Sequence, residues 1–69
     1  MDRQKIHKTL LNLKRALKDE KKGESFYLKV AEIAKDEGML EAAQLFRNAS
    51  KDCKRHSAEI ENVLYNLGD

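Results

Sequence analysis

The stretch KDEGML, residues 35–40, contains the strongest helix-ending signal in this 69-residue chain. The composition on both sides of it favours helix, because proline is absent and Ala, Leu, Lys, Glu and Arg dominate. Glycine tolerates the left-handed backbone conformation that ends many helices, so Gly38 predicts a turn between two helices. We expect one helix over residues 3–36 and a second over residues 39–67.

Three weaker signals refine this assignment. Asp2 is the expected N-cap of the first helix, and Gly68 is expected to close the second. Gly23 lies inside the first helix, where glycine costs about 1 kcal/mol relative to alanine. It permits the close approach of a neighbouring helix, allows a local bulge, or is simply a tolerated surface residue, and the sequence leaves these alternatives open.

Both predicted helices carry a stripe of residues at alternating steps of three and four, the spacing that keeps one face against a packed partner. The stripes are apolar except at two positions on each helix. The first stripe comprises Ile6, Leu10, Leu13, Leu17, Glu20, Glu24, Tyr27, Ala31 and Ala34. The second comprises Ala42, Phe46, Ala49, Cys53, His56, Ile60, Val63 and Leu67.

The polar exceptions fall at matching depths when the chain is folded at the turn. Glu20 precedes Gly38 by 18 residues, and His56 follows it by 18, which places both roughly 27 Å along the hairpin. Glu24 and Cys53 meet about one helical turn nearer the loop. Burying carboxylates in such a layer is costly unless positive charge compensates them, and an imidazole with a divalent metal is one such compensation.

A chain of this length forms a single domain, residues 1–69, whose core needs further support from a metal or a partner subunit. Two helices also leave apolar residues exposed beside the stripes. We therefore expect an all-α antiparallel hairpin that dimerises into a four-helix bundle and doubles the polar layer. The residues to be covered are Leu11, Phe26, Val30, Ile33, Leu45 and Leu64.

The composition also argues against several classes of protein. The 14 Lys and Arg residues alternate along the sequence with 12 Asp and Glu residues, a pattern typical of solvated helices and not of a nucleic-acid-binding strip. The single cysteine excludes an internal disulfide. No apolar run has the length of a membrane span, and no signal-peptide pattern follows the N-terminus, so we expect a cytoplasmic protein without a membrane partner.

The residues 9–64 resemble half of the ferritin-like domain of rubrerythrins. In that family a metal-binding Glu is followed seven residues later by a Tyr, then by an "EEG"-type turn and a helix with a Phe and a Glu-x-x-His pair. Glu20 and Tyr27 match the first spacing, DEG at residues 36–38 matches the turn, and Phe46 and His56 match the second helix. The resemblance implies a di-iron carboxylate bundle in which one hairpin supplies half a site and a homodimer supplies all of it.

The chain departs from the family at Cys53, which occupies the place of the Glu in Glu-x-x-His. That Glu normally bridges the two irons. Two replacements are open: Glu24 swings into the site, or Cys53 binds as a thiolate, which favours Zn²⁺ or a thiolate-ligated iron. The candidate ligands are therefore Glu20, His56, Cys53 and Glu24, with iron as the expected metal and zinc as the alternative.

Three functions remain open from the sequence. The leading hypothesis is a rubrerythrin-like metal-binding protein that handles iron, dioxygen or peroxide and receives electrons from another protein, because the paired Cys-x-x-Cys module of many rubrerythrins is absent. The second is a non-catalytic dimerisation or partner-binding module with a degenerate metal site. The third is a redox protein that uses the thiol of Cys53.

Overall fold

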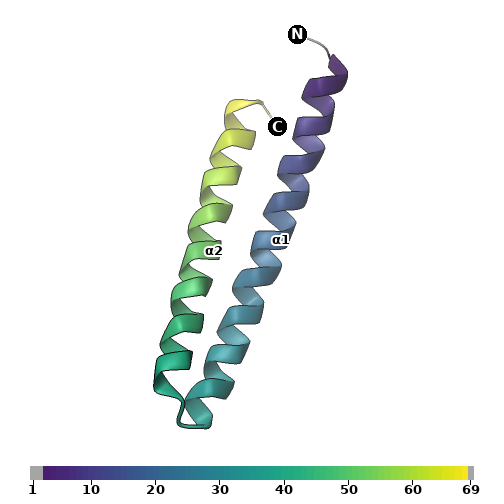
Figure 1. Ribbon diagram of the computed structural model, residues 1–69. Helices are drawn as coiled ribbons and strands as arrows, with labels where there is room; N and C mark the ends of the chain where they lie inside the picture. Colours follow the sequence, from purple (N-terminus) through teal and green to yellow (C-terminus); the bar gives the residue numbers. More distant parts are fainter. Residues whose placement is uncertain (1–2, 69) are drawn as a thin grey trace.

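The computed structural model describes residues 3–68, with side chains from residue 7 onward, and consists of two α-helices folded back on each other (Figure 1). Helix α1 spans Arg3–Asp36 and helix α2 spans Leu40–Asn66. The predicted antiparallel hairpin is confirmed, and the predicted helix bounds agree with the observed ones to within one residue. The expected N-cap Asp2 lies outside the described residues.

The turn has the geometry predicted from its glycine. Gly38 adopts a φ of 78°, in the left-handed region that favours glycine. Its N–H donates to the carbonyl of Lys35 (3.0 Å), and the N–H of Met39 donates to the carbonyl of Ala34 (2.9 Å). These two bonds form a Schellman motif, which satisfies carbonyl groups left open at the end of α1 and reverses the chain.

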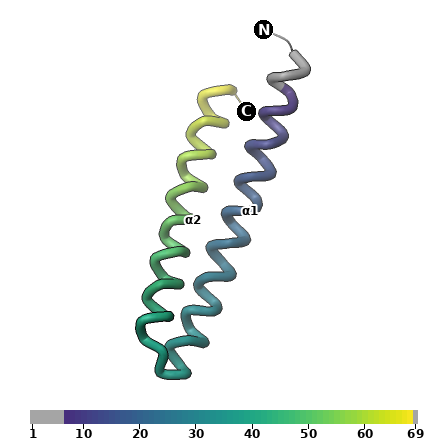
Figure 2. Tube along the Cα trace, viewed as in Figure 1, coloured from purple at the N-terminus to yellow at the C-terminus, as the bar shows by residue number. Residues whose placement is uncertain are grey.

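The hairpin is a narrow rod with extents of 54 × 16 × 13 Å. Helix α1 has 34 residues and α2 has 27, and Figure 2 shows the two helices side by side from the turn to the far end of α2. Within residues 3–68, neither helix combines the length and the apolar character needed to cross a bilayer.

From Leu10 onward the contact stripe of α1 follows the predicted series, whereas that of α2 is rotated; the side chain of Ile6 lies outside the described residues. The predicted α2 positions Phe46, Cys53 and Ile60 are partly buried. The most buried α2 residues recur every seven residues and alternate with these positions along the sequence. Those residues are Ala43, Ser50, Ser57 and Leu64. The predicted positions Ala42, Ala49 and His56 are also partly buried, whereas Val63 and Leu67 are exposed.

The reason for the rotation is side-chain size. The predicted α2 stripe does not include Ser50 and Ser57, but serine is small, and small residues let two helix backbones approach closely. Ser50 satisfies its hydroxyl by donating to the backbone carbonyl of Glu24 (3.2 Å). Leu64, expected beside the contact, is instead buried within it, with 7% of its surface exposed.

The core of one hairpin is small. Apart from Leu64, the buried residues are the alanines Ala31, Ala34 and Ala43 and the two serines, and no large side chain among the described residues is fully enclosed. Much of the apolar surface therefore remains open to solvent. The exposed large apolar side chains include Leu11, Phe26, Leu28, Ile33, Leu45 and Val63.

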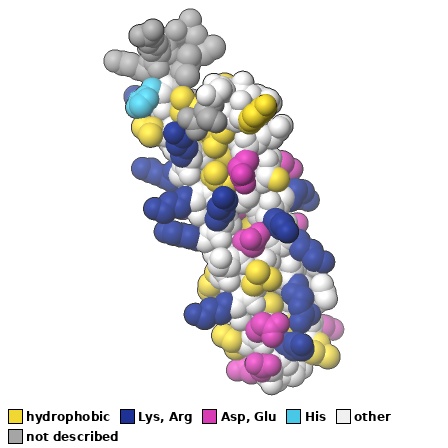
Figure 3. Space-filling model, turned by 180° about the vertical axis from the view of Figure 1, so that it is seen from behind, with side chains coloured by type: hydrophobic (Ala, Val, Ile, Leu, Met, Phe, Trp, Pro, Cys, Tyr) yellow, Lys and Arg dark blue, Asp and Glu magenta, His cyan; other side chains and the backbone are white. Residues whose placement is uncertain are grey.

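The two sides of the hairpin differ in chemistry. Residues seven apart share one side of a packed helix, so the register places Phe26 and Ile33 of α1 on the same side as Leu45, His56 and Val63 of α2. We call this side the site face. Most lysines beside the helix contact lie on the other side, the lysine face; Figure 3 shows how Lys and Arg side chains run along a face of the rod with fewer Asp and Glu between them.

Candidate metal centre

Glu20 of α1 and His56 of α2 meet at the middle of the hairpin. The His56 Nδ1 atom lies 3.4 Å from the Glu20 Oε2 atom, although 36 residues separate them in the chain. Both side chains are partly open to solvent, with exposed fractions of 28% for Glu20 and 43% for His56. The pairing that equal distances from Gly38 predicted is therefore present, and its open side belongs to the site face.

His56 has a second neighbour on its own helix. The Arg55 Nη2 atom lies 3.4 Å from His56 Nε2, and the Arg55 guanidinium also lies 3.8 Å from carboxylate oxygens of Asp52 and Glu59. Since a guanidinium can only donate, this contact suits a neutral imidazole with its proton on Nδ1, directed at Glu20. If Nδ1 of His56 coordinated a cation, the imidazole would carry its proton on Nε2. Arg55 would then have to turn away from Nε2 toward Asp52 and Glu59.

Cys53 is the third member of this group. Its sulfur lies over Gly23, where an added Cβ would be 3.0 Å from Sγ. Partial burial, interaction of the thiol with the Glu20 carboxylate and the negative charges of Glu20, Asp52 and Glu24 all raise the pKa of the Cys53 thiol. The thiol is thus held neutral at physiological pH, which weakens the hypothesis of a reactive thiolate.

The contact with Cys53 decides among the alternatives for Gly23. This glycine is partly buried at the point where α1 meets the cysteine sulfur, so it provides close helix approach. It causes no bulge, because α1 runs without interruption from Arg3 to Asp36.

Glu24 lies between the two sides of the hairpin. Together with Ser50 and the cations Arg47, Lys51 and Lys54, it lines a hollow of about 280 Å³ on the lysine face. Its charge still acts on Cys53, but no contact joins its carboxylate to His56 within the described residues. Glu24 therefore reaches the predicted ligand group only by a change of rotamer.

An aromatic cluster lies beside the site, on the side nearer the turn. The ring of Tyr27 stacks on Phe46 at a centroid distance of 6.3 Å and meets the edge of Phe26 at 5.4 Å. Tyr27 lies about one helical turn from Glu24 and about two turns from Glu20. Its ring packs between the two helices, as its place in the predicted stripe indicated. The cluster lends the site an apolar border.

The donor atoms of one hairpin fit part of a metal site. Two atoms bound to one divalent ion at about 2.1 Å lie about 3.0–3.4 Å apart for bond angles between about 90° and 109°, so the Glu20–His56 separation is compatible with a shared ion. However, no three Cys, His, Asp or Glu side chains in the described part of the chain are arranged to hold a metal. A single hairpin therefore brings together one carboxylate and one imidazole as possible ligands.

Comparison with known proteins agrees with this geometry. Residues 12–69 match the Rubrerythrin family, which is most of the chain. The chain belongs to the rubrerythrin family. No curated protein and no solved structure gave a significant match. Membership in the rubrerythrin family agrees with the two packed helices, and it suggests a di-iron type of fold.

Two residues of this rubrerythrin hairpin lie at the site or in the helix contact although the sequence analysis did not name them. The clearest is Arg55, whose long side chain reaches His56 although adjacent residues of a helix do not face each other, so no sequence pattern signals this contact. Ser57 is buried with a hydroxyl that has no hydrogen-bond partner in the described part of the chain. Its burial could be foreseen only from the rotated α2 stripe, because serine gives no apolar signal.

Proposed function

We propose that this rubrerythrin-family hairpin binds a transition metal, iron in the first instance, in a site that forms between two copies of the chain. The observation that carries the proposal is the convergence of Glu20 Oε2 and His56 Nδ1 at 3.4 Å, half-exposed on one side of the rod. Each chain contributes one carboxylate and one imidazole, and the fold family supplies the precedent of di-iron chemistry. A cytoplasmic location and an external electron donor belong to the same proposal.

The apolar part of the site face supports pairing of two chains. Phe26 is 57% exposed and Leu45 is 65% exposed, although both are large apolar residues beside the contact between the helices. Burying a large apolar side chain of this kind stabilises a complex by about 1.5–3 kcal/mol relative to leaving it in water. A second hairpin placed on this face would cover these residues and bring a second Glu20 and His56 to the first pair.

The chemistry of the site depends on Cys53. In the family pattern this position carries a bridging carboxylate, and here it carries a thiol whose pKa is raised by burial and by Glu20. A dimer therefore has two carboxylates fewer to neutralise two divalent ions. Glu20 and His56 are the residues that would hold the metal. The metal would supply redox chemistry toward peroxide or dioxygen.

Metal analysis of protein purified without chelators, together with the mass in solution, tests the proposal. The expected result is a dimer that retains iron or zinc and loses it in Glu20→Gln and in His56→Ala. Glu32→Gln and His7→Ala are the matched controls, since both residues are exposed and lie outside the site, and they should retain the metal. A monomer, or a dimer whose metal content and thermal stability do not respond to Fe²⁺ or Zn²⁺, would contradict the proposal.

A non-catalytic helical dimerisation module is the second candidate, and the neutral thiol of Cys53 favours it. In that case the chain keeps the four-helix scaffold but lacks the two carboxylates at position 53 whose negative charge would help to hold two metal ions. The same measurement separates the candidates, because a stable dimer without bound metal supports the second and excludes the first.

A further inference from the structure

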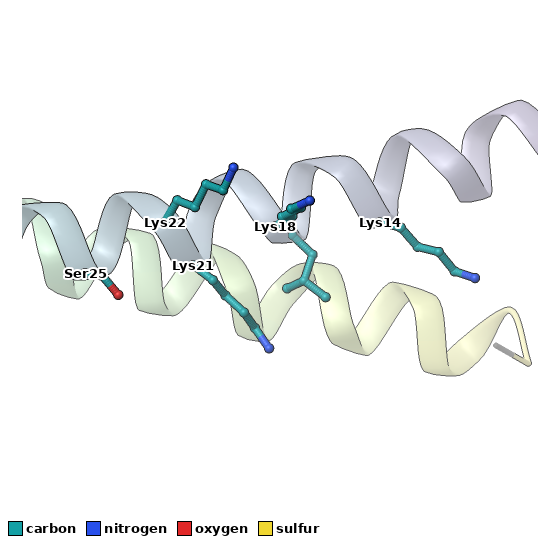
Figure 4. A pocket seen from close by; sticks show the side chains of 6 residues that line it. Lys14, Lys18, Lys21, Lys22 and Ser25 are labelled. Atoms are coloured by element: carbon teal, nitrogen blue, oxygen red, sulfur yellow. The ribbon is translucent and has the colours of Figure 1, made fainter.

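The lysine face contains three adjoining hollows that follow the contact between the helices. The largest, about 560 Å³, is lined by Lys14, Leu17, Lys18, Lys21, Lys22 and Ser25 (Figure 4). The middle one, about 440 Å³, is lined by Lys21, Glu24, Ser25, Lys54, Ser57, Ala58 and Glu61. The third is the hollow around Glu24 and Arg47 described above. Shared lining residues join them into one groove, which we call the lysine groove.

The charge of this groove differs from that of the whole chain. Its lining holds seven Lys and Arg residues and two carboxylates, a net charge of +5, whereas the chain carries +2, so the rest of the molecule is net negative. The signs that alternate along the sequence are therefore separated in space. Figure 4 shows Lys14 and Lys21 extending toward α2 and Lys22 pointing away from it, which spreads the positive charge across the groove and its rim.

Much of this charge is not neutralised within the chain. Lys21 pairs with Glu61 at 4.0 Å, while Lys18, Lys22, Lys51 and Lys54 form no ion pair with any described residue. Surface lysines cost little to leave in water, so they need no internal partner for stability. Their concentration on one side nevertheless produces a field that attracts and orients an anionic partner.

We propose that the lysine groove docks an acidic segment of another protein, of a length near one short helix. The groove runs from Lys14 to Leu28 along α1, roughly 21 Å, which equals about 14 residues of helix. Leu17, Leu28 and Ala58 give it an apolar floor between the cations. A segment with carboxylates on its flanks and apolar side chains at its centre complements both features.

The same lining disfavours a nucleic acid. Glu24 and Glu61 lie inside the groove and would repel a phosphate chain of uniform charge, whereas a polypeptide can place a neutral or basic residue opposite each of them. No aromatic ring lines the three hollows, so unpaired bases would find no stacking surface there. The groove also lies on the side away from His56, so docking there leaves the site face free for a second copy of the chain.

Fluorescence anisotropy with a labelled acidic peptide tests the proposal. The probe repeats Glu-Glu-Ala-Leu over about 20 residues, enough to span the groove as a helix, and a labelled single-stranded oligonucleotide of equal charge is the competing probe. The test variant is Lys18→Glu with Lys54→Glu. The control is Lys8→Glu with Lys29→Glu, which changes the charge equally at exposed positions outside the groove.

The expected result is peptide binding that weakens about tenfold or more in the test variant and less than about threefold in the control at equal ionic strength. Amide NMR shifts in the wild-type protein should follow residues 14–28 and 47–61. Equal weakening in both variants, tighter binding of the oligonucleotide than of the peptide, or shifts centred on the site face would each overturn the proposal. Circular dichroism of both variants verifies that the substitutions leave the helices intact.

Discussion

His56 Nδ1 lies 3.4 Å from Glu20 Oε2 because the two residues stand at equal distances from Gly38 on antiparallel helices. The position of the turn thus sets the site. An insertion of one residue in either helix would rotate the following residues by about 100° and move them by about 1.5 Å, which would separate the pair.

Replacing Cys53 with glutamate should increase iron binding, because it restores the Glu-x-x-His pattern of the family. Cys53→Glu returns a carboxylate to each chain beside His56, and a dimer would regain two negative charges to balance two divalent ions. We expect the iron content to rise toward two ions per dimer, measured by metal analysis after loading with Fe²⁺ and gel filtration. Cys53→Gln has a similar shape without the charge and is the control; an equal gain in that variant would show that size and not charge limits the site.

Gly23 and Cys53 should be energetically coupled. Gly23→Ala alone gains about 1 kcal/mol of helix propensity, but its Cβ would lie 3.0 Å from the Cys53 sulfur, so the gain is offset by crowding. In a Cys53→Ala background the same change should stabilise by nearly the full amount. Chemical denaturation of the four proteins of this double-mutant cycle measures the coupling, expected at about 1 kcal/mol; additive effects would show that the contact carries no strain.

Gly38 should be the glycine most sensitive to substitution. Gly38→Ala forces a side chain into a left-handed backbone at a φ of 78°, for a loss of roughly 1–2 kcal/mol in unfolding free energy. Gly68 has a similar φ of 80° but lies at the end of α2, where the chain can fray. Thermal denaturation of Gly68→Ala should therefore show a clearly smaller loss, and equal losses would contradict the role of the turn.

The stability of the hairpin should respond to the ionisation of Cys53. Because burial and the Glu20 carboxylate raise the thiol pKa above its ordinary 9.0, the folded state holds the proton more tightly than the unfolded state. The resulting stabilisation is fully present below pH 9.0 and is lost as the pH rises through the higher folded pKa. Thermal midpoints of the wild type should fall more steeply above that pH than those of Cys53→Ala, and parallel curves would refute the assignment.

A charge on the site face should prevent dimerisation. Phe26→Lys places an ammonium group on the apolar surface that a second hairpin would cover, so sedimentation equilibrium should show a shift to monomer. Leu28→Lys is the matched control, since Leu28 is 53% exposed and lines the hollow on the lysine face. If both variants remain dimeric, the contact between copies uses a different surface.

The sequence predicted the fold closely because the relevant signals are local. A single strong turn glycine and a three-four apolar pattern determine a hairpin, and the depth of Glu20 and His56 then follows from the rise per residue. The burial of Ser50 and Ser57 could not be foreseen, because serine has no apolar signal and its fit depends on how closely the helices approach. The separation of charge was missed for a related reason: neighbours in sequence point to different sides of a helix, so alternating signs along the chain say nothing of their distribution in space.

The glycine opposite Cys53 has a consequence for how such a site can evolve. Gly23 places no side chain opposite position 53, where the Cys53 sulfur lies 3.0 Å from the place that an added Cβ would take, so a residue exchanged at position 53 meets backbone and not a side chain at this point of α1. Ligand chemistry can then change by single substitutions while the scaffold stays fixed. A hairpin of this kind is an economical starting point from which duplicated or paired descendants can acquire different metal preferences.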